Sequence, residues 1–99
     1  MGFKYAVVGA TGNVGREILQ IMSERDVHAK DVVALASSRS VGAEVSYGED
    51  EVLKIHDLET FDFEGIDIVL SSPGAKVSER YVPRATSAGS VVIDNTSQF

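Results

Sequence analysis

Three glycines spaced three residues apart, Gly9, Gly12 and Gly15, are the residues of this chain best suited to holding a phosphate group. They follow a short apolar run at residues 3–8, and an amphipathic pattern begins among them. A strand, a glycine turn and a helix in this order make up a dinucleotide-binding unit. Amides at the start of the helix, helped by its dipole, would bind the diphosphate.

Each glycine has a separate expected role in this turn. Gly9 would take the bend out of the strand, Gly12 would let the backbone approach the diphosphate, and Gly15 would let the helix pack closely on the strand. The spacing is G-x-x-G-x-x-G and not the commoner G-x-G-x-x-G. A glycine-rich turn that binds nothing is therefore the alternative interpretation.

A second candidate anion site follows the next apolar run, residues 32–36, and has the sequence SSRS at residues 37–40. A site that prefers NAD carries an acidic residue about twenty residues after the glycines, which binds the ribose 2′-hydroxyl. No Asp or Glu stands between Asp31 and Glu44. The guanidinium of Arg39 among hydroxyls suits a phosphate instead. The sequence therefore predicts NADP and not NAD, with a plain polar turn as the alternative.

Composition excludes several other chemistries. The net charge of −6 and the lack of a basic run argue against nucleic-acid binding. The longest apolar run is far too short to cross a membrane, and no secretory signal precedes it, so we expect a cytoplasmic protein. The chain has no cysteine, and neither His28 nor His56 has a partner at metal-ligand spacing. We therefore expect no disulfide, cysteine nucleophile or metal site.

The order of strands and helices expected around these residues predicts an α/β fold, a Rossmann-like NAD(P)-binding domain. Its mostly parallel sheet would carry an inserted β-hairpin with an acidic tip in place of the second crossover helix. The expected core strands, in their order across the sheet, are residues 32–36, 3–8, 66–70 and 90–94, and the hairpin strands are residues 44–47 and 52–55.

Helical patterns complete the prediction. The first helix follows the glycines and would bury Val14, Ile18, Leu19 and Met22. The second is expected at residues 78–88. For this second helix we expect an N-cap at Ser78, a kink near its start from Pro83 and an end at Gly89. A single helical turn is also expected earlier in the chain, at residues 56–59.

Together, these motifs resemble the amino-terminal part of the aspartate-β-semialdehyde dehydrogenases. Similar stretches run through the whole chain in order: AVVGATGNVGRE at residues 6–17, LASSRSVG at 35–42, FEGIDIVLSSPG at 63–74 and VVIDNTSQF at 91–99. One departure is Pro73, where the family more often has alanine. The related N-acetyl-γ-glutamyl-phosphate reductases share the layout but match the SSRSVG loop less well. A free-standing NADP-binding regulatory module is a third possibility.

The resemblance implies that residues 1–99 form the NADP-binding domain of an oxidoreductase. Enzymes of this family interconvert aspartyl phosphate and aspartate semialdehyde through an acyl-enzyme on a cysteine, in lysine, threonine and methionine biosynthesis. Their catalytic residues lie further along the chain, so no catalytic residue is expected here, and their second domain forms a homo-oligomer. The implied cofactor contacts are Thr11, Gly12, Asn13 and Val14 to the diphosphate, and Ser37, Arg39 and Ser40 to the 2′-phosphate. Ser72 and Gly74 would line the cofactor cleft, and Asn95 would lie near the nicotinamide and the substrate phosphate.

Overall fold

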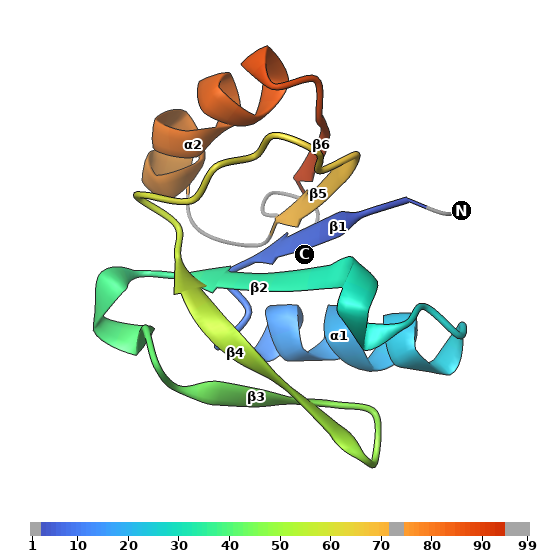
Figure 1. Ribbon diagram of the computed structural model, residues 1–99. Helices are drawn as coiled ribbons and strands as arrows, with labels where there is room; N and C mark the ends of the chain where they lie inside the picture. Colours follow the sequence, from blue (N-terminus) through green and yellow to red (C-terminus); the bar gives the residue numbers. More distant parts are fainter. Residues whose placement is uncertain (1–2, 72–74, 95–99) are drawn as a thin grey trace.

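The computed structural model describes residues 3–71 and 75–94, which form six strands, two α-helices and two short 3-10 turns. The strands form one sheet in the order β3-β4-β2-β1-β5-β6, and every neighbouring pair is parallel except β3 and β4 (Figure 1). The elements are β1 (Tyr5–Val8), α1 (Asn13–Glu24), η1 (Ala29–Asp31), β2 (Val32–Ala36), η2 (Ser38–Ser40), β3 (Glu44–Tyr47), β4 (Glu51–Asp57), β5 (Ile68–Ser71), α2 (Ala75–Ser87) and β6 (Val91–Asp94).

Strand β1 lies inside the sheet because its residues are apolar on both sides. Ala6 and Val8 are fully buried in the cluster that α2 covers, and Val7 is fully buried in the cluster on the opposite face. Its neighbours are β2 and β5. The predicted order of the four core strands and the α/β class are therefore confirmed.

The two α-helices cover opposite faces of the sheet (Figure 1). Helix α1 packs Leu19 and Met22 against one face, and α2 packs Tyr81 and Ala85 against the other. Val14 was expected in the buried face of α1, but it is 40% exposed because it belongs to the helix's first turn. No helix in the described parts of the chain is long and apolar enough to span a membrane.

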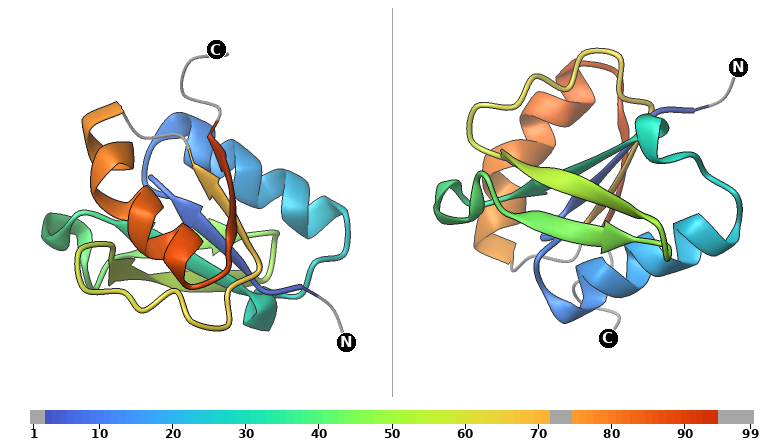
Figure 2. Two further views of the ribbon diagram at one scale, coloured as in Figure 1. Left: turned by 90° about the horizontal axis from the view of Figure 1, so that it is seen from above. Right: turned by 60° about the horizontal axis from the view of Figure 1, so that its bottom comes forward.

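The predicted hairpin is present as β3 and β4, and it is also part of the sheet. The last residues of β4 pair in parallel with β2, from Ala34 beside Ile55 to Ala36 beside Asp57. The helical turn expected at residues 56–59 is therefore wrong, because this pairing extends the strand to Asp57. The tip of the hairpin reaches the carboxyl end of α1 (Figure 2, right).

Helix α2 begins at Ala75, three residues before the predicted start, so Ser78 lies inside the helix and is not its N-cap. Serine inside a helix costs less than about 0.7 kcal/mol, so a capping preference does not fix a helix start. Pro83 lies well inside the helix and not in its first turns. The helix ends at Ser87, and the predicted glycine at its carboxyl end, Gly89, follows with a φ of +97°, which favours glycine.

Arg84 of α2 fixes the long connection between β4 and β5. Its Nη2 donates to the carbonyl of Leu58 at 2.6 Å, and its Nη1 donates to those of Glu59 at 3.0 Å and Phe61 at 3.3 Å. The guanidinium also lies over the ring of Phe63, 5.6 Å from its centre. This connection replaces a crossover helix on the α2 face.

Candidate functional site

The glycine turn is held at the carboxyl ends of β1 and β2 by backbone hydrogen bonds. The amides of Gly9 and Ala10 both donate to the carbonyl of Leu35, at 2.9 and 3.2 Å. Gly9 has a φ of +80°, a conformation that favours glycine. The amide of Gly12 donates back to the carbonyl of Gly9 at 3.0 Å and closes the turn.

Gly12 and Gly15 differ in the space around them. A Cβ atom at Gly15 would lie 2.1 Å from the carbonyl oxygen of Gly9, so even alanine cannot be accommodated without moving backbone. This contact gives Gly15 its predicted packing role. A Cβ atom at Gly12 would meet only the same oxygen at 3.5 Å, an ordinary contact, and Gly12 has a φ of −82°. The fold itself therefore does not require glycine at position 12.

The start of α1 presents backbone amides without a capping side chain. Gly12 is the N-cap residue, and the first turn contains no acidic residue. The helical ladder begins with the amide of Arg16, which donates to the carbonyl of Gly12 at 3.0 Å. The three preceding amides of an α-helix have no acceptor within it. Asn13 and Val14 are exposed there, and Thr11 is half-buried. This helix start can bind an anion.

The second predicted anion site forms the tight turn η2, directly after β2. The amide of Ser40 donates to the carbonyl of Ser37 at 2.9 Å. The side chain of Arg39 is exposed, and within residues 3–71 and 75–94 it makes no hydrogen bond or ion pair. Since β2 also holds the glycine turn, the two predicted phosphate-binding segments lie at the same edge of the sheet.

The remaining predicted site residues, Ser72, Gly74 and Asn95, lie outside the described residues. The strands that precede them end level with β1, because Val8 is paired with Ser71, and Ser71 with Asp94. The ends of β2, β1, β5 and β6 therefore share one edge of the sheet. Helix α1 and helix α2 leave this edge on opposite faces, which makes the point between β1 and β5 the switch point where α/β sheets bind ligands.

Asp57 is a polar residue of this edge that sequence reasoning missed. It ends β4 beside Ala36, and its carboxylate accepts a hydrogen bond from the amide of Glu59 at 2.9 Å. The signal was the alternation along β4, where Leu53 and Ile55 are buried and their neighbours exposed. Asp57 lies on the side of β2 away from the glycine turn.

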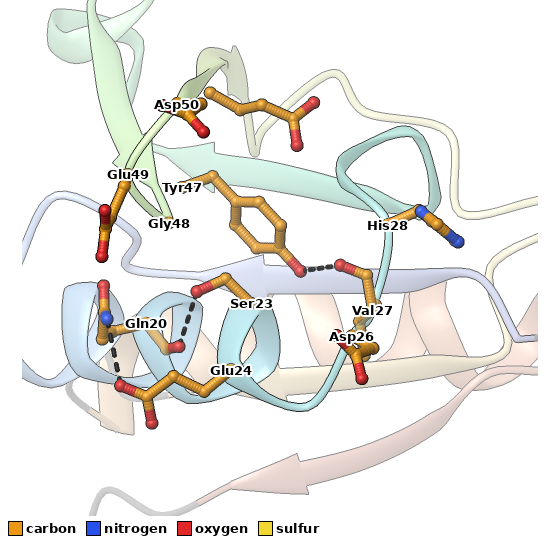
Figure 3. Close-up of a pocket in the computed structure, with 11 residues that line it drawn as sticks. Gln20, Ser23, Glu24, Asp26, Val27, His28, Tyr47, Gly48, Glu49 and Asp50 are labelled. Carbon is orange, nitrogen blue, oxygen red and sulfur yellow. Dashed lines mark hydrogen bonds between the residues drawn. The ribbon is translucent and has the colours of Figure 1, made fainter.

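A cleft of about 410 Å³ lies between the end of α1 and the tip of the hairpin (Figure 3). It has five carboxylates and no lysine or arginine in its lining, so it would repel a phosphate. It is therefore a poor site for a dinucleotide. Its lining residues are Gln20, Ser23, Glu24, Asp26, Val27, His28, Tyr47, Gly48, Glu49, Asp50 and Glu51.

Tyr47 closes this cleft against the connection after α1. Its hydroxyl donates to the carbonyl of Val27 at 2.5 Å (Figure 3). Burial raises the pKa of the Tyr47 phenol, and the carboxylates of Glu51 and Asp31 add to the effect. A hydrogen bond from Lys4 at 3.1 Å lowers the pKa of Asp31. Within the described parts of the chain, no cluster of histidine and acidic side chains could hold a metal ion.

Comparison with known proteins identifies the family. The family described as "Semialdehyde dehydrogenase, NAD binding domain" matches residues 4–99. The chain belongs to this family. Aspartate-semialdehyde dehydrogenase of Legionella pneumophila is 49% identical over 94 residues, which are 95% of this chain and 27% of that protein.

Solved structures of semialdehyde dehydrogenases share this fold. Aspartate semialdehyde dehydrogenase II of Vibrio cholerae complexed with ASA superposes with a TM-score of 0.87 at 37% identity, over 100% of this chain and 32% of that one. The Candida albicans enzyme with NADP gives a TM-score of 0.68 at 26% identity, over 98% of this chain and 30% of that one. The chain therefore spans less than a third of the length of each of these relatives.

Proposed function

We propose that residues 1–99 are the NADP-binding domain of an aspartate-semialdehyde dehydrogenase. The observation that carries the proposal is the uncapped start of α1 beside the glycine turn, at the same edge as the exposed Arg39. The family match and the named relatives support the same assignment. They give no better support to an N-acetyl-γ-glutamyl-phosphate reductase.

The proposed site residues combine this geometry with the family resemblance. The amides of Asn13 and Val14, with Thr11 and the open position at Gly12 beside them, would hold the diphosphate. Ser37, Arg39 and Ser40 would hold the 2′-phosphate, and Ser72, Gly74 and Asn95 are proposed from the resemblance alone. The relative from Candida albicans solved with NADP supports the choice of cofactor. A bound NADPH would supply the hydride that reduces the acyl group of aspartyl phosphate to an aldehyde.

These 99 residues are proposed to bind the cofactor but not to catalyse the reaction by themselves. The family resemblance implies an acyl-enzyme on a cysteine, and the sequence contains none. We expect the 99-residue chain to bind the cofactor without turning over aspartate semialdehyde, NADP and phosphate. Measurable turnover by the pure chain would overturn this assignment of roles. By the same resemblance, we propose that the whole enzyme is a cytoplasmic homo-oligomer.

Titration with NADP and NAD tests the cofactor assignment. Arg39→Ala should weaken NADP binding by about 1.5–3 kcal/mol, the range for a hydrogen bond to a charged group, and should leave NAD binding nearly unchanged. Arg25→Ala is the matched control, because it removes the same charge at the far end of α1. Equal loss of NAD and NADP affinity in Arg39→Ala would contradict the assignment of the 2′-phosphate.

A further inference from the structure

Ser71, the last residue of β5, has a fully buried hydroxyl that finds no hydrogen-bond partner among the described residues. Its relative exposure is 0%, and no donor or acceptor in residues 3–71 and 75–94 bonds to its Oγ. Proteins rarely leave a buried polar atom in this state, because the group has given up its bonds to water and gained none in return. The unpaired hydroxyl therefore calls for a functional explanation.

Ser90, at the opposite end of the same strand pair, shows that this fold can satisfy a buried serine. Ser90 precedes β6 and is 6% exposed, and its Oγ donates to the carbonyl of Ile66 at 2.7 Å. Ser71, at the end of β5, and Ser90, directly before β6, are therefore buried serines with opposite hydrogen-bond states. The difference makes them a matched pair for experiment.

Ser71 is located where the fold would place a ligand. It is paired with Val8, the residue directly before the glycine turn. It lies two residues after Val69, so its side chain shares the sheet face that α2 covers. The strand order β2-β1-β5 makes this neighbourhood the switch point of the sheet. The unpaired hydroxyl is thus beside the proposed dinucleotide site.

We infer that Ser71 is a positioning residue for the dinucleotide, and that its hydroxyl gains its hydrogen-bond partner when the cofactor binds between the ends of β1 and β5. This inference rests on the proposed function. The Ser71 side chain is fully buried, so a direct contact with the cofactor would need a small shift of the groups that cover it. A hydroxyl can donate or accept, so it suits the carboxamide of a nicotinamide or a backbone group that moves with it.

The two sides of β1 give the two halves of the cofactor different partners. Arg39 follows β2 on one side of β1, and Ser71 ends β5 on the other. If Arg39 holds the adenosine half, Ser71 serves the nicotinamide half. Loss of the Ser71 hydroxyl should therefore affect NADP and not a ligand that contains the adenosine half alone.

Ser71→Ala and Ser90→Ala test the inference in the 99-residue chain. Thermal unfolding without ligand gives stability, and calorimetry gives the affinities for NADP and for adenosine 2′,5′-bisphosphate. We expect Ser71→Ala to be at least as stable as the wild type, to bind NADP about two- to tenfold more weakly and to bind the bisphosphate equally well. Ser90→Ala should be less stable and, while folded, should bind NADP as the wild type does.

Three other results for the affinity or the stability of Ser71→Ala would overturn the inference. If Ser71→Ala binds NADP as the wild type does, or loses affinity for both ligands equally, Ser71 does not serve the nicotinamide half. If it is destabilised as much as Ser90→Ala, its hydroxyl is already paired without ligand. In these cases wild-type binding of NADP still supports the proposed function. If the wild type binds neither NADP nor NAD, both proposals are wrong.

Discussion

Gly12 and Gly15 are one helical turn apart, but the structure needs them for different reasons. We expect Gly12→Val to fold nearly as well as the wild type, because the Cβ position meets only one atom, at 3.5 Å. It should abolish detectable NADP binding by filling the approach to the amides of α1. Gly15→Ala should instead lower stability by several kcal/mol, since its Cβ would lie 2.1 Å from a backbone oxygen.

Circular dichroism during thermal unfolding and calorimetry with NADP separate the two effects. Gly42→Ala is a useful control, because its φ of +93° strains a side chain but the position has open space and lies outside the glycine turn. Normal NADP binding by Gly12→Val would show that position 12 does not face the cofactor. A fully stable Gly15→Ala would show that α1 can move away from the turn.

At this scale, sequence reasoning predicted the residues whose role is local. Gly9 needs its positive φ and Gly15 its close contact within one strand–turn–helix unit, so their spacing alone suggested both. Asp57 was missed because its position depends on strand pairing. Only the register of β4 against β2 brings it to the edge that carries the proposed cofactor site.

Besides the pairing of β4 with β2, the hairpin is tied to the segment after α1 by the hydroxyl of Tyr47, which donates to the carbonyl of Val27. Removing this bond in Tyr47→Phe should cost about 0.5–1.5 kcal/mol at neutral pH. Tyr5→Phe is the control, since the Tyr5 hydroxyl makes no hydrogen bond in the parts of the chain that the structure describes. Urea unfolding at pH 7 measures both changes.

The raised pKa of Tyr47 predicts a pH dependence as well. Folding favours the neutral phenol, so its contribution to stability is complete below the unfolded pKa, which is about 10. The contribution is lost as pH rises through the higher pKa of the folded state. Urea unfolding above about pH 10 should therefore show a shallower loss of stability in Tyr47→Phe than in the wild type. Parallel curves would mean that the fold does not protect this phenol.

Sequence reasoning predicted whole elements better than their ends. Apolar runs and alternation predicted every strand to within about two residues, because burial determines both patterns. The end of β4 and the start of α2 were wrong because packing between elements sets them. Parallel pairing with β2 extends β4 to Asp57, and a helical serine such as Ser78 costs too little to prevent an earlier start.

The whole molecule has an asymmetric sheet. The β3 edge belongs to a hairpin that contacts α1, whereas no described strand pairs with the outer side of β6. Val91 and Ile93 are two residues apart on β6, so their side chains share one face of the strand, and they are 60% and 44% exposed. Their partners on β5, Ile68 and Leu70, are only half-buried, so apolar surface continues across two strands. An open edge beside apolar surface favours pairing with another chain.

We therefore predict that the 99-residue chain self-associates through β6. Val91→Lys should weaken this association by about tenfold or more, because a charged side chain on an edge strand opposes pairing. Val52→Lys is the matched control, since Val52 is 57% exposed but lies on β4, which β3 covers. Sedimentation velocity over a range of concentrations measures both variants against the wild type. A wild-type chain that stays monomeric at high concentration, or equal effects of the two substitutions, would show that β6 is not the associating edge.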